Sequence, residues 1–157
     1  MATVSRVLIA TDFGAPSAAA LRYAREFARA FGAILHVVHV TGDVRDRVDA
    51  LPAPAVDLES LQAEYEADAR QKLATFISEE HSPAGTPDEI ATVLTSNHPA
   101  AAILAYAAEQ RIDLIVTGTH GRNGFVDLFM GSVAQQIVRT APCPVVTLRG
   151  VTPPAVA

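Results

Sequence analysis

Residues 114–132 read LIVTGTHGRNGFVDLFMGS, and this stretch does most to decide how the chain folds. An apolar run of strand length leads into a glycine-rich segment, and a helix-like segment follows over 133–140. Glycine has no Cβ and tolerates positive φ, so successive N–H groups in such a passage can converge on an anion. Ser132 lies where a helix N-cap would lie, beside the positive end of the helix dipole. The stretch therefore predicts either a phosphate site or a surface loop whose glycines only turn the chain.

The same alternation of strand-like and helix-like segments runs through the whole chain. Apolar, β-branched runs predict strands over 7–10, 34–40, 89–94, 113–117 and 145–148. Helical periodicity predicts helices over 17–31, 57–81, 99–110 and 133–140, and residues 41–56 are expected to form a loop. Such alternation is typical of an α/β domain, a parallel sheet with helices on both faces.

The first predicted helix carries a clear apolar face. Leu21, Ala24, Ala28 and Phe31 recur at helical spacing, and Gly32 is expected to end the helix. The opposite face is expected to hold the charged residues Arg22, Arg25, Glu26 and Arg29. In the long second helix, the charge run Glu64, Glu66, Asp68 and Arg70 predicts a solvated face, and the apolar stripe comprises Leu58, Leu61, Tyr65, Ala69, Leu73, Phe76 and Ile77.

Composition limits the classes of function. The chain has 157 residues, half of them apolar, which predicts one globular domain over 1–149 and a frayed tail over 150–157. A net charge of −5 argues against general nucleic-acid or anionic-membrane binding. The single cysteine excludes an internal disulfide, and no signal segment or long apolar run is evident, so we expect a cytoplasmic protein.

Two turns hold most of the special residues: the turn after the first predicted strand and the turn after the fourth. In doubly wound sheets, ligands bind beyond the carboxyl ends of the strands, where the strand order reverses. If the first and fourth strands are neighbours, Asp12 and Gly118 line one crevice. Asp12 has a second interpretation, because an aspartate just before a helix often serves only as a cap or turn former.

The glycine segment matches neither of the two best-known phosphate motifs. A P-loop needs a lysine directly after its second glycine, and the single lysine of the chain, Lys72, lies far from every glycine. A dinucleotide fingerprint needs Gly-x-Gly-x-x-Gly in the first β–α turn, whereas His120 stands two residues after Gly118 in the fourth turn. Any phosphate would therefore be held by backbone N–H groups and the Ser132 hydroxyl, with His120 or Arg122 as a further contact or as solvated loop residues.

The spacing Gly118-x2-Gly121-x9-Gly131-Ser132 resembles the ATP-binding signature of the universal stress protein family. The flanks 113–116 and 141–146 and the first strand with its acidic end, 7–13, are also similar, so the resemblance covers about residues 4–149. It implies a single-domain, five-stranded parallel sheet of flavodoxin-like or adenine nucleotide alpha hydrolase-like order, 3-2-1-4-5. The implied ligand is ATP, with or without Mg²⁺.

The resemblance also implies roles for individual residues. Asp12 would face the ribose and adenine, and Val40 would offer backbone hydrogen bonds to adenine. The implied nucleotide contacts as a whole are Thr11, Asp12, Val40, Thr117, Gly118, Gly121, Arg122, Gly131, Ser132 and Val133. Two positions depart from the family pattern, since Gly14 replaces a common serine and Asn97 a common glycine, and both lie outside the phosphate signature.

Other candidate groups favour structural roles. His36 and His39 lie three apart on one strand, so they point to opposite faces and do not form a metal site, while His81 and His98 are expected to be exposed. Cys143 lacks an electropositive setting, which favours an inert thiol. Its neighbours Pro142 and Pro144 place strand 145–148 at a sheet edge, where we expect a two-fold homodimer, as is usual in the family.

Three functions are consistent with this sequence. The first is a protein that binds ATP or another adenine nucleotide as a regulatory ligand in stress response or signalling. The second is a true ATPase, which the missing lysine disfavours, so we expect slow hydrolysis at most. The third is a partner-binding homodimer with an empty cleft. As a test of the site, we expect Gly121→Val to abolish ATP binding and to leave the dimer intact.

Overall fold

The structure of the protein is a computed structural model, which describes residues 3–48, 57–80, 87–119 and 131–148. The elements in chain order are β1 (Arg6–Ala10), α1 (Ala15–Phe31), β2 (Ile34–Thr41), α2 (Arg45–Val48), α3 (Leu58–Glu79), β3 (Glu89–Thr95), α4 (Pro99–Glu109), β4 (Leu114–Gly118), α5 (Ser132–Thr140) and β5 (Val145–Leu148). The predicted segments are confirmed to within two residues at each end, with one error. The segment expected as a loop over 41–56 contains the end of β2 and the short helix α2.

The strands form one parallel sheet in the order β3-β2-β1-β4-β5, as expected. β1 lies at the centre, and Val7, Leu8 and Ile9 are fully buried. A strand covered on both faces has no polar alternation, which explains the continuous apolar run in the sequence. The chain order reverses between β1 and β4, so the carboxyl ends of these neighbours border the switch point of the fold.

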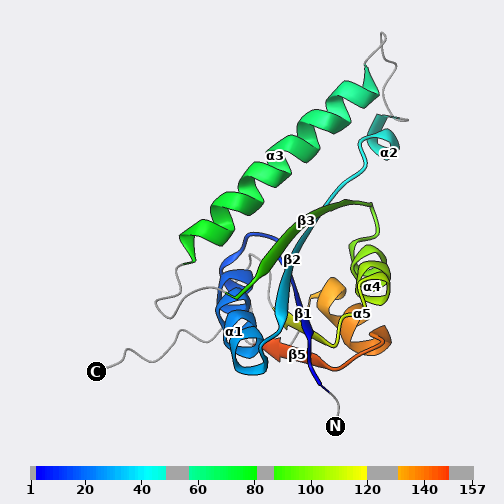
Figure 1. Ribbon diagram of the computed structural model, residues 1–157. Coiled ribbons are helices and arrows are strands. Elements are labelled where there is room, and N and C mark those ends of the chain that lie inside the picture. The colour runs from blue at the N-terminus through cyan, green and yellow to red at the C-terminus, as the bar shows by residue number, and fades with distance from the viewer. Residues whose placement is uncertain (1–2, 49–56, 81–86, 120–130, 149–157) are drawn as a thin grey trace.

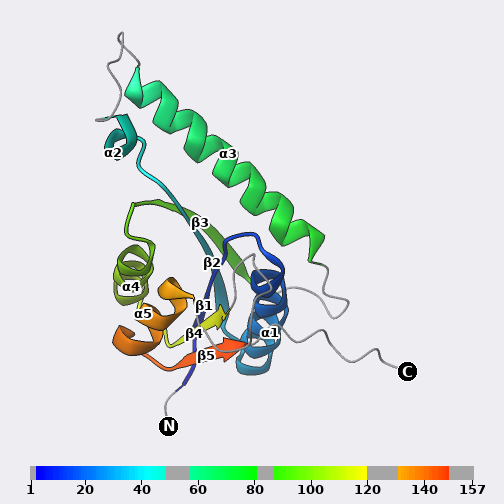
Figure 2. The same ribbon diagram turned by 180° about the vertical axis from the view of Figure 1, so that it is seen from behind.

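Helices cover both faces of the sheet (Figures 1 and 2). α1 and α3 lie on one face, where Val7, Ile9 and Val37 join the core, and α4 and α5 lie on the other, where Leu8 and Val38 do. Gly32 ends α1 with a φ of 64°, the left-handed conformation that only glycine adopts without cost. No helix in the described part of the chain is long and apolar enough to cross a membrane.

β5 ends the sheet on one side, which confirms the predicted edge strand. The carbonyls of Pro144 and Leu148 accept hydrogen bonds from β4 and the residue after it, through the N–H groups of Ile115 (3.0 Å) and Thr119 (2.9 Å). Because alternate residues of a parallel strand point their backbone groups to opposite sides, the N–H and C=O of Thr147 point away from β4.

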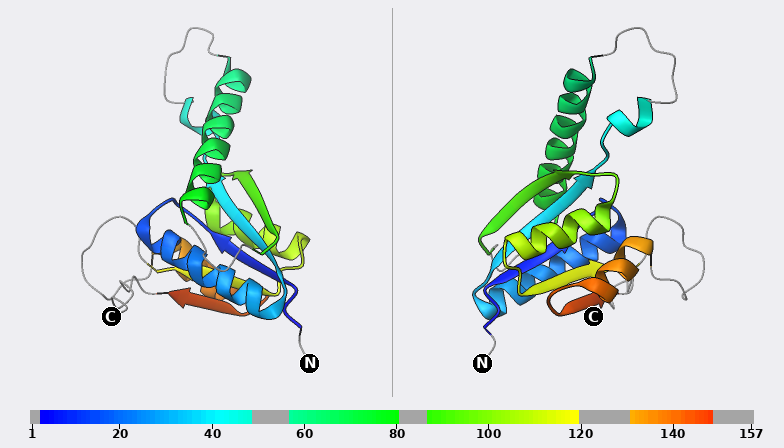
Figure 3. Two further views of the ribbon diagram at one scale, coloured as in Figure 1. Left: turned by 60° about the vertical axis from the view of Figure 1, so that its left-hand side comes forward. Right: turned by 90° about the vertical axis from the view of Figure 1, so that its right-hand side faces the viewer.

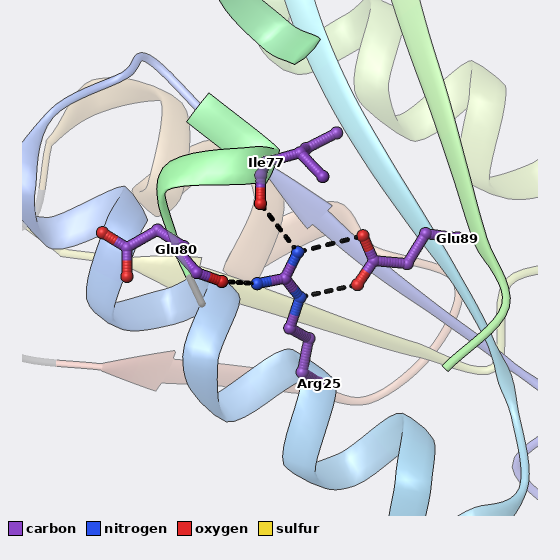
Figure 4. A network of polar contacts seen from close by, with 4 residues as sticks. All are labelled: Arg25, Ile77, Glu80 and Glu89. Atoms are coloured by element: carbon purple, nitrogen blue, oxygen red, sulfur yellow. Dashed lines mark hydrogen bonds and ion pairs between the residues drawn. The ribbon is translucent and has the colours of Figure 1, made fainter. Parts of the chain in front are cut away.

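Arg25 is buried, contrary to the expectation that it lies on the exposed face of α1; only 2% of its side chain is accessible. Its guanidinium binds both carboxylate oxygens of Glu89 at the start of β3, at 2.6 and 3.1 Å. It also donates to the backbone carbonyls of Ile77 and Glu80, at the end of α3 (Figure 4). The helical pattern missed this because the partners come from segments more than fifty residues away.

The first half of α3 extends beyond the body of the domain (Figures 1 and 3). Ala69, Leu73 and Phe76 of its predicted apolar stripe are buried, while Tyr65 remains 45% exposed. Glu66 departs from the expected solvated face, because its side chain accepts hydrogen bonds from Thr95 and Gln62. The hydrogen bond from Thr95 ties the middle of α3 to the end of β3.

Candidate functional site

A cavity of about 360 Å³ opens at the carboxyl ends of β1, β2 and β4, at the switch point of the sheet. Asp12 and Gly118 both line it, so the two turns singled out in the sequence do meet. Its described lining comprises Ala10, Thr11, Asp12, Pro16, Ser17, Val38, His39, Val40, Pro99, Ile103, Thr117, Gly118, Thr119, Gly131, Ser132, Val133, Ala134 and Ile137. Val38, Val40, Pro99 and Ile103 form an apolar part of the lining, and the other residues include the hydroxyl-bearing Thr11, Ser17, Thr117 and Ser132.

The turn after β1 presents the Asp12 carboxylate at the cavity. Oδ1 accepts hydrogen bonds from the Gly14 N–H (2.9 Å) and the Ser17 hydroxyl (2.7 Å), and the Ser17 hydroxyl accepts one from the Asp12 N–H (3.2 Å). Within the described residues Oδ2 forms no hydrogen bond. The turn-forming interpretation of Asp12 is thus confirmed for Oδ1, while a contact between Oδ2 and a ligand stays a prediction.

Val40 lies in the apolar wall with Val38, Pro99 and Ile103. The Val38 carbonyl accepts a hydrogen bond from the N–H of Thr11, directly after β1, so Val40 points its backbone groups to the same side of β2. β1 has already ended at that level. The Val40 N–H and C=O are therefore directed to the cavity, where a flat heterocycle could pair with them.

The end of β4 touches the turn after β1. A Cβ built on Gly118 would lie 2.8 Å from the Pro16 carbonyl oxygen, closer than real Cβ atoms come to such an atom. Thr117 and Thr119 on either side are buried. Gly131 N–H donates to the Thr119 carbonyl at 3.1 Å, and both residues line the cavity.

Gly131, and not Ser132, is the N-cap of α5. Ser132 is the first helical residue, so the N-cap prediction for Ser132 was wrong by one position. The consequence is small for the site, because the first N–H groups of a helix lack intrahelical partners and carry its positive partial charge. Ser132, Val133 and Ala134 line the cavity at this point.

Asn97, one of the departures from the family pattern, connects two segments that are far apart in the sequence. Its side chain accepts a hydrogen bond from the Asp43 N–H (3.0 Å) and donates to the Asp43 carbonyl (3.3 Å) and to Asp46 Oδ2 (2.5 Å). It thereby joins the loop after β2 and the helix α2 to the loop before α4. A glycine could not make this connection.

Several predicted residues lie outside the described residues: Gly121 and Arg122 of the signature, and His81 and His120. Across the described ranges, no group of three or more His, Cys, Asp or Glu residues is arranged to hold a metal ion. Asp12 is the single acidic residue in the described cavity lining. Among the described residues, the Asp12 carboxylate is thus the one acidic side chain of the lining that could ligate a Mg²⁺ ion.

The remaining titratable candidates are structural. Burial, with a smaller contribution from Asp113, raises the pKa of the Cys143 thiol, which keeps it protonated and inert. Burial, and then the charge of Arg6, lowers the pKa of His36, whose Nδ1 lies 2.9 Å from the Tyr106 hydroxyl. His36 and His39 lie on opposite faces of β2, as predicted, and His98 is exposed.

The sequence of residues 3–149 matches the model of the universal stress protein family. A universal stress protein from Thermus aquaticus, from the 3′ region of QAH/OAS sulfhydrylase, is 36% identical over 143 residues, covering 91% of this chain and 97% of that protein. The chain belongs to the universal stress protein family.

Solved structures of universal stress proteins share the fold. One, in complex with cAMP, has a TM-score of 0.67 at 20% identity, covering 96% of this chain and 99% of that one. Another, from Archaeoglobus fulgidus in complex with dAMP, has a TM-score of 0.58 at 23% identity, covering 93% and 98%. The resemblance seen in the sequence is thus confirmed as family membership.

Sequence reasoning missed part of the universal stress protein cavity. Pro16, Ser17 and His39 line it, although none belongs to the glycine signature. The sequence held one indication for Ser17. Its hydroxyl follows Asp12 by five residues across the start of a helix, a distance at which it can bind the Asp12 carboxylate. Nothing in the sequence marks Val38 and Ile103 as lining residues, because valine and isoleucine are also the usual residues of a protein core.

Proposed function

We propose that this universal stress protein binds ATP, or another adenine nucleotide, as a regulatory ligand in the cavity at the switch point. The observation that carries the proposal is the contact of Gly118 with Pro16, beside the start of α5. This contact brings the carboxylate of Asp12 and the N-terminus of α5 to one cavity. A carboxylate suits ribose hydroxyls, and free helical N–H groups suit phosphate.

The lining divides into parts that match an adenine nucleotide. The adenine would lie against the apolar wall and pair with the backbone of Val40. Asp12 Oδ2 would accept hydrogen bonds from the ribose. The phosphates would lie at the N-terminus of α5, beside Gly131, Ser132 and Val133. Thr11, Thr117, Gly121 and Arg122 complete the proposed site, the last two on the strength of the family signature.

Binding is favoured over rapid turnover. Phosphoryl transfer needs fixed cations on the transferred group, and the described lining contains neither lysine nor arginine. Mg²⁺, if it accompanies the nucleotide, would neutralise phosphate charge. We therefore propose slow hydrolysis at most, with the nucleotide acting as a signal.

Two family members support an adenine ligand, since their structures are complexes with cAMP and with dAMP. The test is to release any nucleotide that co-purifies with the protein, identify it by mass spectrometry, and titrate the emptied protein with ATP, ADP, AMP and cAMP by calorimetry. We expect saturable binding of at least one of them. Absence of bound nucleotide together with no heat of binding at millimolar ATP would contradict the proposal. Steady-state turnover of ATP near the typical enzyme value of ~10 s⁻¹ would instead indicate a true ATPase.

We also infer that the protein forms a two-fold dimer through β5. The outward N–H and C=O of Thr147 form an unpaired sheet edge within the described residues, and a second copy of the same strand is a suitable partner. Tyr23 of α1 is 53% exposed and Phe27 packs against the same core cluster as Val146 and Leu148 of β5. Because α1 contacts β5, apolar surface on this helix would add to the pairing.

A further inference from the structure

Phe13, which follows Asp12, has an unusual backbone. Its φ is +65°, in the left-handed region that residues with a Cβ rarely adopt. A phenylalanine persists there only when its surroundings hold it. The conformation sets the direction in which the chain leaves Asp12, and so it sets where the Asp12 carboxylate lies.

His39 contacts the residues on both sides of Asp12. Its Nδ1 donates to the Thr11 carbonyl at 2.8 Å, and its ring stacks on the Phe13 ring with a centroid distance of 4.2 Å. The Phe13 ring is held on another side by Phe76 of α3, at 5.8 Å. The Phe13 N–H donates to the Thr11 hydroxyl at 2.9 Å, which closes the turn.

We propose that His39 is the positioning residue for Asp12. By binding the Thr11 carbonyl and stacking on Phe13, it holds the strained turn that aims Asp12 at the nucleotide. Hydrogen bonds from Gly14 and Ser17 fix the Asp12 carboxylate relative to the turn. The backbone conformation of the turn therefore sets the direction of Oδ2. This inference rests on the proposed nucleotide site and assigns to His39 a role that the glycine signature does not contain.

The proposal differs from simple packing in one consequence. If His39 acts by holding Phe13 at positive φ, its loss lets Phe13 relax to negative φ and turns Asp12 away. A glycine at position 13 adopts positive φ without steric cost, so it should make His39 dispensable. If His39 only fills space, Phe13→Gly removes a second ring and worsens the defect.

The experiment titrates ATP by calorimetry into the wild type, His39→Ala, Phe13→Gly and the double variant, with Phe76→Leu as a control that loosens packing on Phe13 but keeps His39. The cost of the left-handed conformation corresponds to about a tenfold change in affinity. We expect His39→Ala to weaken ATP binding by about that factor, and the double variant to return to within about threefold of the wild type. Wild-type affinity in His39→Ala, or a double variant as weak as His39→Ala, would overturn the proposal.

A second readout needs no nucleotide and keeps this inference separable from the proposed function. Backbone couplings of Phe13, measured by NMR, report its φ directly. They should indicate positive φ in the wild type and Phe76→Leu, and negative φ in His39→Ala. Positive φ retained in His39→Ala would overturn the role of His39 even if the protein bound no ATP. A wild type that binds no ATP but shows the expected change of φ would contradict the proposed function alone.

Discussion

Gly118, the last residue of β4, lies so close to Pro16 at the start of α1 that a Cβ on Gly118 would stand 2.8 Å from the Pro16 carbonyl oxygen. The first glycine of the signature is therefore required by the packing of two turns, apart from any contact it makes with phosphate. The turn after β1 and the end of β4, the two segments that the sequence singles out, meet at this contact, and both line the cavity.

Gly118→Ala should lower both stability and nucleotide affinity. The added methyl group meets backbone atoms of Pro16, which cannot rotate away, so we expect a loss of about 1–3 kcal/mol in the free energy of unfolding. Denaturant unfolding measures this loss. The matched control is Gly131→Ala, where a Cβ would meet nothing within 4 Å and the loss should stay below about 1 kcal/mol. Equal losses in the two variants would contradict the close-contact explanation.

Asp12→Asn should weaken ATP binding with little effect on folding. The amide oxygen can still accept from Gly14 and Ser17, but the group replacing Oδ2 donates and cannot accept from a ribose hydroxyl. Loss of a hydrogen bond to a charged group predicts at least about a tenfold fall in affinity. Calorimetry measures the fall, with the exposed Asp88→Asn as control. Unchanged affinity in Asp12→Asn would restrict Asp12 to a turn-forming role.

Arg25→Met should destabilise the fold strongly. It leaves the Glu89 carboxylate and two carbonyls at the end of α3 without their donor in a buried position, and breaking such a pair costs about 3–5 kcal/mol. The control is Arg70→Met, because Arg70 is 62% exposed in its pair with Glu66 and should contribute less than about 1 kcal/mol. Similar losses in the free energy of unfolding of both variants would show that burial does not determine how much the Arg25 ion pair contributes to stability.

His36 should make stability depend on pH. Its pKa in the folded protein lies below the ordinary value of 6.5, because burial and the charge of Arg6 disfavour the imidazolium. Below pH 6.5 the unfolded chain therefore binds a proton that the folded protein does not. The contribution of His36 to the free energy of unfolding is fully present above pH 6.5 and is lost as the pH falls toward the folded-state pKa. Unfolding measured across this range should be less pH-dependent in His36→Asn; an unchanged slope would exclude His36 as the source.

Thr147→Pro should convert the proposed dimer to a monomer. Proline removes the N–H that points away from β4 and leaves the hydrogen bonds between β4 and β5 in place. Sedimentation or light scattering gives the mass, and Thr147→Ala is the control that keeps the N–H. A dimer that persists in Thr147→Pro with unchanged affinity would place the interface elsewhere.

Structural features that depend on neighbouring residues could be predicted from the sequence, and features that depend on distant residues could not. The apolar run in β1 and the glycine at the end of α1 predicted their elements, because burial on two faces and a left-handed cap leave local traces. Strand order came from family resemblance, since local patterns do not say which strands pair. α2 was missed because four residues show no helical period.

The same limit applies to the site. Asp12 and Gly118 were identified because they directly follow or end apolar strand segments, and such positions can be recognised in the sequence. Arg25 was misassigned, since its partners Ile77, Glu80 and Glu89 are close only after folding. His39 and its contact with Phe13 were missed for the same reason, because a positive φ at a phenylalanine has no signature in the sequence.

A titration of the isotopically labelled protein with ATP, followed by NMR, tests whether an adenine nucleotide binds at the switch point of the sheet. Saturable chemical-shift changes should be largest at the amides of Asp12, Val40, Gly118 and Val133, which line the cavity from four different elements or their adjoining turns. The amides in the first half of α3 should stay unchanged. No change at millimolar ATP, or changes confined to α3, would contradict the account.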